Sequence, residues 1–115
     1  MDINEYQSRA AEFAVYREHM RDAQERLTYT TFGVVGESGE FADKMKKRLR
    51  GLSQGIEPTK RQTELLVSEL GDVLWYIAAV AGELGLSLEE VAVFNLHKLV
   101  TRVDLFTTDT DNPDR

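Results

Sequence analysis

Cysteine is absent from the 115 residues of this sequence, and no segment has the pattern of a targeting signal. Without cysteine the chain forms no disulfide, no zinc–thiolate site and no cysteine nucleophile. Its first residues, MDINEYQSRA, lack the basic and then apolar order of a signal peptide. Glu69 and Asp72 interrupt the most apolar stretch, residues 65–81, so we expect a buried helix there and not a membrane span. These absences predict a cytoplasmic protein without a membrane partner.

Basic residues are also fewer than acidic ones, with 14 lysines and arginines against 20 aspartates and glutamates. The net charge of −6 argues against a surface that binds nucleic acid. A hydrophobic content of 42% and a charged content of 30% are ordinary for a globular protein, and the length suits one domain. We expect that domain to span residues 1–106 and the polar tail, residues 107–115, to be disordered.

Capping and turn signals divide the domain into four helices, and no stretch alternates as a β-strand should. Capping boxes at residues 2–5, 59–62 and 87–90 open the first, third and fourth helices, and Thr28 is the expected cap of the second. Residues 51–58 form the clearest loop. The fold class is therefore all-α, and the predicted helices span about residues 3–20, 28–50, 59–84 and 87–106.

Residues 33–40 read GVVGESGE, and glycine-rich stretches often bind phosphate. Here the spacing is GxxGxxG without a preceding strand, and no lysine follows as in a Walker loop, so both phosphate-loop motifs fail. We therefore place Gly33, Gly36 and Gly39 inside the second helix, where three glycines cost about 3 kcal/mol relative to alanine. Such a cost indicates the close approach of another backbone or of a ligand.

A second segment repeats the acidic part of this stretch. ESGE at residues 37–40 is matched by ELGD at residues 69–72, and each places two carboxylates three residues apart. Residues at i and i+3 share one helix face, and the short connection makes the two helices antiparallel neighbours. We therefore predict that four carboxylates meet between the helices: Glu37, Glu40, Glu69 and Asp72.

The chemistry of these carboxylates favours a bound metal. Either pair alone is most simply a solvated helix face or part of a salt bridge. The second pair, however, lies in an apolar helix, where a carboxylate is costly unless it is paired or bound to a metal. An all-oxygen ligand set suits Mg²⁺, with Mn²⁺ as a substitute, and the only histidines, His19 and His97, lie outside both motifs, which disfavours iron.

The two motifs together resemble the signature of the MazG-like all-α nucleoside triphosphate pyrophosphohydrolases. Glu37-x-x-Glu40 is followed, after 28 intervening residues, by Glu69-x-x-Asp72, and the stretches GVVGESGEFADKMKK and ELGDVLWYIAAVAGELGLSLEEVAVFNLHKL are similar to that family. The resemblance covers about residues 3–103. It implies a four-helix bundle that assembles into a homodimer or a homotetramer.

The same resemblance implies an enzyme that hydrolyses a nucleoside triphosphate, either a dNTP or a non-canonical NTP, at the α–β linkage. The products are the monophosphate and pyrophosphate, and the activity would be a house-cleaning one. Glu37, Glu40, Glu69 and Asp72 would hold Mg²⁺, which neutralises phosphate oxygens and activates water. Glu37 or Glu40 would take the proton of that water, with Glu37 preferred.

Several further side chains are candidates for substrate contacts. Lys44 falls on the helix face of Glu37 and Glu40, and Lys47 lies beside it. On the last helix, Asn95, Lys98 and Arg102 form a stripe that suits the outer phosphates, although such a stripe is more often a solvated face.

Two aromatic residues, Tyr76 and Trp75, are the candidates for stacking on the base. Core or interface packing is the competing interpretation of both residues, and it applies to Trp75 in particular.

Two other functions stay open. A phosphoribosyl-ATP-type pyrophosphohydrolase of similar fold would accept one adenylated substrate and ignore free dNTPs. A non-catalytic helical module, with the apolar third helix as a dimer interface, would tolerate Glu69→Gln and Asp72→Asn because no metal would need those charges.

Overall fold

Five helical segments make up the computed structural model, which describes the backbone of residues 1–108 and the side chains of residues 1–103. The α-helices are α1 (Ile3–Ala11), α2 (Ala23–Ser53), α3 (Lys60–Glu83) and α4 (Leu88–Thr108), and a short 3-10 helix, η1 (Val15–Glu18), follows α1. No strand occurs in this described part of the chain, so the predicted all-α class with four helices is confirmed. Of the predicted tail, residues 109–115 lie outside the described residues.

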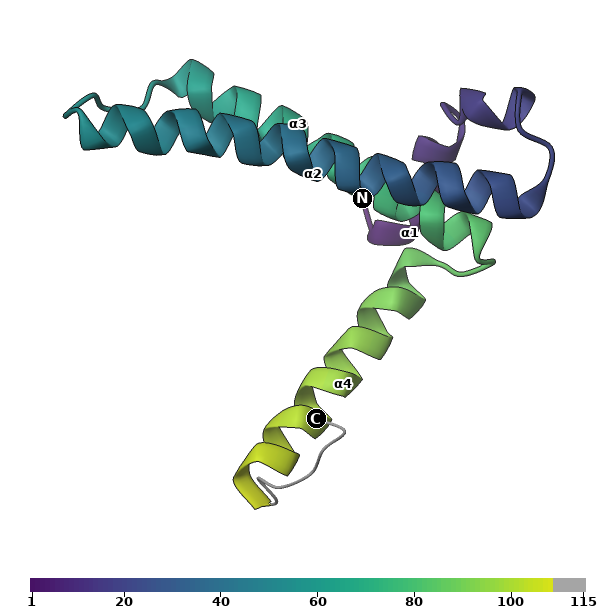
Figure 1. The fold of residues 1–115 in the computed structure, drawn as a ribbon. Coiled ribbons are helices and arrows are strands. Elements are labelled where there is room, and N and C mark those ends of the chain that lie inside the picture. Colours follow the sequence, from purple (N-terminus) through teal and green to yellow (C-terminus); the bar gives the residue numbers. More distant parts are fainter. Residues whose placement is uncertain (109–115) are drawn as a thin grey trace.

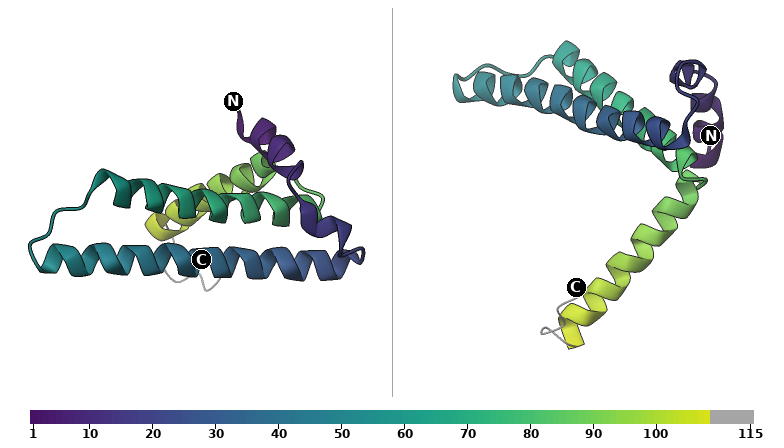
Figure 2. Two further views of the ribbon diagram at one scale, coloured as in Figure 1. Left: turned by 90° about the horizontal axis from the view of Figure 1, so that it is seen from above. Right: turned by 45° about the vertical axis from the view of Figure 1, so that its right-hand side comes forward.

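α2 and α3 form a long antiparallel pair, which is the main body of the molecule (Figure 1; Figure 2, left). α1 packs against α3 at the end away from the α2–α3 loop, and its polar side chains bond to the corner between α3 and α4. The Gln7 amide group donates to the carbonyls of Ala78 and Leu86 at 3.3 and 3.0 Å, and it accepts from the Leu88 amide at 2.9 Å. One side chain thereby connects three helices.

Three of the four α-helices begin at the predicted caps. Asp2 accepts from the Glu5 amide at 2.7 Å, and the capping boxes at residues 59–62 and 87–90 each show both reciprocal hydrogen bonds. Each cap satisfies amides at the helix start that have no partner within the helix. Local sequence therefore determines where α1, α3 and α4 begin.

The start of α2 differs from the prediction, because Asp22 and not Thr28 caps the helix. The Asp22 carboxylate accepts from the Glu25 amide at 3.0 Å. Aspartate is as good a cap as serine or threonine, and an additional helical turn forms when it is used. The Thr28 hydroxyl lies inside the helix and donates to the Gln24 carbonyl at 2.9 Å.

The first helix is shorter than predicted, since α1 ends at Ala11 and not beyond Met20. After a turn, η1 directs Tyr16 inward, where its ring lies 5.4 Å from that of Tyr29 and edge-on to Trp75 at 6.3 Å. This aromatic cluster joins three segments that are far apart in the sequence. Its contacts favour the turn over continuation of α1.

α4 does not complete a closed bundle within one chain. It leaves the end of α3 and projects away from the α2–α3 pair (Figure 1; Figure 2, right). Its apolar residues are exposed, including Phe94 at 76%. α3 is also less buried than predicted: Val67 and Leu70 are exposed, and Ala78 and Ala81 are its buried residues. The prediction of a helix buried nearly all round is wrong for the single chain, because α2 and α1 cover only part of its circumference.

The glycines of α2 differ in their surroundings. A Cβ atom added at Gly33 would overlap the Tyr76 ring, whereas nothing lies within 4 Å of one added at Gly36 or Gly39. The predicted close approach therefore holds for Gly33 and is wrong, within one chain, for the other two. The approach is made by an aromatic ring and not by a backbone.

We expect Gly33→Ala to destabilise the protein by about 1–3 kcal/mol, because the Tyr76 ring must move. Gly36→Ala is the matched control on the same helix, and it should stabilise the protein by about 0.5–1 kcal/mol through helix propensity alone. Thermal unfolding followed by circular dichroism measures both. A Gly33→Ala variant as stable as Gly36→Ala would contradict the packing described here.

Candidate metal centre

Three of the four predicted carboxylates converge between α2 and α3. Glu37 on α2 and Glu69 and Asp72 on α3 each offer one oxygen, and these oxygens all lie within 4.8 Å of one another. Glu37 and Glu69 are half-buried, whereas Asp72 is exposed, so the group is open to solvent on one side. We call these three residues the acidic cluster.

Glu40, the fourth predicted carboxylate, is exposed and does not belong to the acidic cluster. It is nevertheless close enough for its charge to raise the pKa of Glu37.

The acidic cluster carries unbalanced negative charge. Burial raises the pKa of Glu37, and the charges of Asp72, Glu69 and Glu40 raise it further, as does a hydrogen bond with the Glu69 carboxyl group. Like charges at this separation repel one another, and a nearby cation relieves the repulsion. The site therefore favours a bound cation.

Lys44 supplies one such cation from α2. Its Nζ lies 2.7 Å from Oε1 of Glu69, and the two side chains are only 27% and 17% exposed. The hydrogen bond to Glu69 raises the pKa of Lys44, although partial burial acts in the opposite direction. Lys47 is different: it is mostly exposed and pairs with Asp43 at 3.0 Å.

The two predicted aromatic residues are adjacent on α3, with their rings edge-on at 5.0 Å, but they pack against different helices. Tyr76 packs against Gly33 near Tyr29, and burial, Tyr29 and the charges of Glu37 and Asp72 raise its pKa, so it borders the acidic cluster. Trp75 faces α1, where its indole N–H donates to the Ala10 carbonyl at 3.1 Å. The packing interpretation therefore accounts for Trp75, which lines a pocket of about 400 Å³ against α1.

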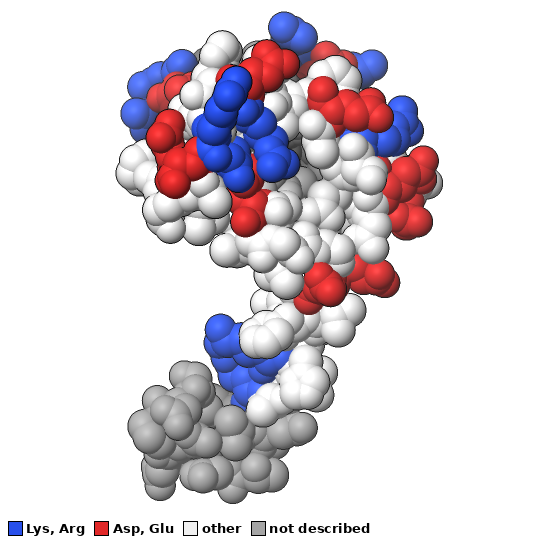
Figure 3. All heavy atoms as spheres, turned by 90° about the vertical axis from the view of Figure 1, so that its right-hand side faces the viewer, with Lys and Arg blue, Asp and Glu red and all other residues white. Residues whose placement is uncertain are grey.

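The predicted stripe on α4 is separated from the acidic cluster within one chain. Asn95, Lys98 and Arg102 are all exposed, and they lie on the helix that projects from the body. Figure 3 shows mostly uncharged atoms around one basic patch on α4, and Lys98 and Arg102 are the only lysine and arginine of this helix. The structure thus groups Lys44 and Tyr76 with the carboxylates but not Asn95, Lys98 or Arg102.

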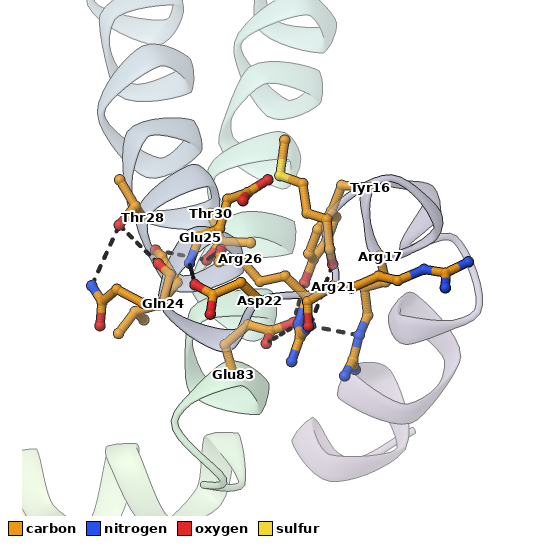
Figure 4. Close-up of polar contacts among 12 residues, drawn as sticks. Tyr16, Arg17, Arg21, Asp22, Gln24, Glu25, Arg26, Thr28, Thr30 and Glu83 are labelled. Carbon is orange, nitrogen blue, oxygen red and sulfur yellow. Dashed lines mark hydrogen bonds and ion pairs between the residues drawn. The ribbon is translucent and has the colours of Figure 1, made fainter.

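Sequence reasoning missed a second carboxylate centre, at the far end of α3 (Figure 4). The Glu83 side chain is 3% exposed, and it accepts from Arg26 at 2.9 Å and from the Tyr16 hydroxyl at 2.9 Å. Arg17 lies 3.6 Å away. The only signal in the sequence is a glutamate in the last turn of an apolar helix, because its partners are 57 and 67 residues distant.

The two carboxylate centres therefore differ in chemistry. Both carboxylate oxygens of Glu83 have protein partners, and two of these partners are arginines. This centre is therefore a structural link between η1, α2 and α3. The acidic cluster has three convergent carboxylates and one lysine. Its all-oxygen donors and open side fit a hard divalent ion such as Mg²⁺ or Mn²⁺.

Comparison with known proteins agrees with this site. The family model of the MazG nucleotide pyrophosphohydrolase domain matches residues 24–106, which include the whole acidic cluster. Gene 37 protein of Mycobacterium phage L5 is 42% identical over 105 residues, and the match covers 90% of each chain. No solved structure gives a significant match. With the match running from the start of α2 through most of α4, the chain belongs to the MazG nucleotide pyrophosphohydrolase family.

Proposed function

We propose that the protein hydrolyses nucleoside triphosphates, either dNTPs or non-canonical NTPs, to the monophosphate and pyrophosphate with the help of Mg²⁺. The observation that carries the proposal is the acidic cluster, whose three oxygens within 4.8 Å repel one another unless a cation joins them. Membership of the MazG family supports the reaction type. Glu37, Glu69 and Asp72 would hold the ion.

A divalent ion bound there would neutralise phosphate oxygens and make water more acidic. In the reaction, a water oxygen bonds to the α-phosphorus, the bond from that phosphorus to the bridging oxygen breaks, and pyrophosphate leaves. We propose Glu40 as the acceptor of the water proton, because it adjoins the acidic cluster without belonging to it. This proposal reverses the preference for Glu37 that the sequence suggested. We also propose that Tyr76, whose pKa is raised in part by the charges of Glu37 and Asp72, contacts the nucleoside.

A substrate panel tests this function. Purified protein is incubated with canonical NTPs, dNTPs, modified NTPs and phosphoribosyl-ATP, each with Mg²⁺ or with EDTA, and pyrophosphate and orthophosphate are measured separately. We expect Mg²⁺-dependent release of pyrophosphate from at least one triphosphate. Release from phosphoribosyl-ATP alone would favour the phosphoribosyl-ATP-type pyrophosphohydrolase, and no release from any compound would exclude the enzymatic function.

Glu40→Gln separates proton transfer from metal binding. If Glu40 accepts the water proton, removal of the Glu40 carboxylate should lower kcat by about 10²–10⁴-fold. The affinity for Mg²⁺, measured by calorimetry without substrate, should stay within about threefold of the wild type, because the three ligands remain. Equal loss of activity and of Mg²⁺ affinity would instead make Glu40 a ligand.

We also propose that copies of this chain associate. The exposed apolar residues of α3 and α4, among them Val67, Leu70, Phe94 and Leu96, form surfaces of the kind that protein interfaces cover. By length and composition α3 could cross a membrane, since an 18-residue window within it has a mean hydropathy of 1.5. Glu69 and Asp72 lie near its middle, where a membrane makes charge costly, so we favour a homodimer or homotetramer in the cytoplasm. Sedimentation equilibrium showing only monomer would contradict this proposal.

A further inference from the structure

The acidic cluster already has a cationic partner within the protein, the side chain of Lys44. Lys44 Nζ lies 2.7 Å from Oε1 of Glu69, which is one of the three convergent carboxylates. Both side chains are largely covered, so salt and water screen this ion pair less than an ordinary surface pair. The lysine therefore neutralises part of the charge that would otherwise attract a metal.

We propose that Lys44 is an internal counter-ion of the acidic cluster, which a divalent ion must displace from Glu69 before it binds. The inference rests on the proposed metal centre. It assigns Lys44 a place in metal binding that differs from the direct substrate contact suggested by the sequence.

The geometry supports exchange between two cations. An ammonium group 2.7 Å from one carboxylate oxygen occupies coordination space that a Mg²⁺ ligand needs, because Mg²⁺ binds oxygen at about 2.1 Å. The lysine stem is flexible, whereas the carboxylates are fixed on two packed helices, so the lysine is the group that can move. Lys44 lies on α2 seven residues beyond Glu37, which is two helical turns, and it stays beside the site after it leaves Glu69.

Displacement has a consequence for the substrate. While Lys44 is bound to Glu69, its charge is used within the protein. Once a divalent ion takes over Glu69, the lysine keeps a positive charge at the edge of the cluster that is no longer bound to Glu69, and this charge attracts phosphate. Metal binding thereby prepares the site for the triphosphate, and the order of binding is metal first.

Calorimetric titration with Mg²⁺ and with Mn²⁺, without nucleotide, tests this inference. Lys44→Met removes the competing cation and keeps the length of the side chain, so metal affinity should rise on the order of tenfold. Lys46→Met is the matched control, since Lys46 is 70% exposed and contacts Asp43 at 3.8 Å. The metal affinity of Lys46→Met should stay within about threefold of the wild type, because this substitution removes the same charge from the same helix without touching the cluster.

Thermal unfolding provides a second readout that does not depend on catalysis. In EDTA, Lys44→Met should unfold at a lower temperature than the wild type, because three carboxylates then lack their internal cation. Saturating Mn²⁺ should remove that difference. Lys44→Arg keeps the charge and should restore the stability in EDTA.

The outcomes separate the two proposals. Equal metal affinity in the wild type and Lys44→Met would overturn the counter-ion role and leave the metal centre intact. Weaker metal binding by Lys44→Met would also overturn it. No metal binding by any variant would overturn the metal centre itself.

Discussion

Asp72→Asn should lower kcat/KM for Mg²⁺-dependent pyrophosphate release by about a thousandfold, which corresponds to about 4 kcal/mol of lost transition-state stabilisation. Asp72 is the exposed member of the acidic cluster, and its oxygen lies within 4.8 Å of those of Glu37 and Glu69. Asparagine has nearly the same shape but no charge, so the substitution tests the ligand role with little change in packing. A metal centre that loses one of three carboxylates holds its ion weakly and stabilises the triphosphate poorly.

Glu64→Gln is the control for this experiment. Glu64 lies on the same helix, is exposed, and makes only a 3.9 Å contact with Arg61. Its activity should match the wild type within about twofold, since removal of a solvated charge changes little. Undiminished activity in Asp72→Asn would instead contradict the role of Asp72 as a metal ligand.

Glu83→Gln is expected to cause the largest loss of stability, about 2–4 kcal/mol, which lowers the melting temperature by roughly 10 °C. The Glu83 carboxylate joins Tyr16 on η1 to Arg26 on α2, and its side chain is 3% exposed (Figure 4). Glutamine keeps the volume but leaves the charge of Arg26, which is 16% exposed, without an anionic partner. Urea denaturation measures the effect. Glu5→Gln, which breaks a 4.0 Å surface pair with Arg9, should change the stability by less than about 0.5 kcal/mol.

The same centre predicts a loss of stability in acid. Burial alone would raise the pKa of Glu83, but hydrogen bonds from Arg26 and Tyr16 and the charge of Arg17 lower it below its ordinary value of 4.5. As the pH falls below about 4.5, the unfolded chain takes up this proton more readily than the folded chain does, so the contribution of Glu83 to stability decreases. Glu83→Gln should therefore lose less stability than the wild type between neutral pH and pH 4. Parallel curves would contradict the assigned role.

The long antiparallel pair could be predicted because its local signals agree. A capping box opens α3, an apolar run follows, and Gly85 adopts a positive φ of 75° beyond its end. The end of α1 could not be predicted in this way. Its position depends on contacts of Tyr16 with Tyr29 and Trp75, which lie far along the chain. The direction of α4 likewise depends on tertiary contacts made by Gln7, which no periodicity indicates.

The candidate site could be predicted to a similar extent. Spacing at i and i+3, together with the antiparallel pairing expected from the short loop, was sufficient to bring Glu37, Glu69 and Asp72 together. It could not show that Glu40 lies outside the group, because the rotation of α2 about its axis is set by packing, including that of Tyr76 over Gly33. The ion pair of Lys44 was also hidden, since helical phase indicates a shared face but not a partner on the next helix.

The position of the bound metal is the most direct test of the central claim, that the acidic cluster holds the catalytic ion. Crystals grown with Mn²⁺ and a non-hydrolysable nucleoside triphosphate would be measured at the manganese absorption edge. We expect an anomalous peak within about 2.2 Å of carboxylate oxygens of Glu37, Glu69 and Asp72, next to the phosphates. A nucleotide bound with its manganese at other residues, and with these three carboxylates free of metal, would contradict the account.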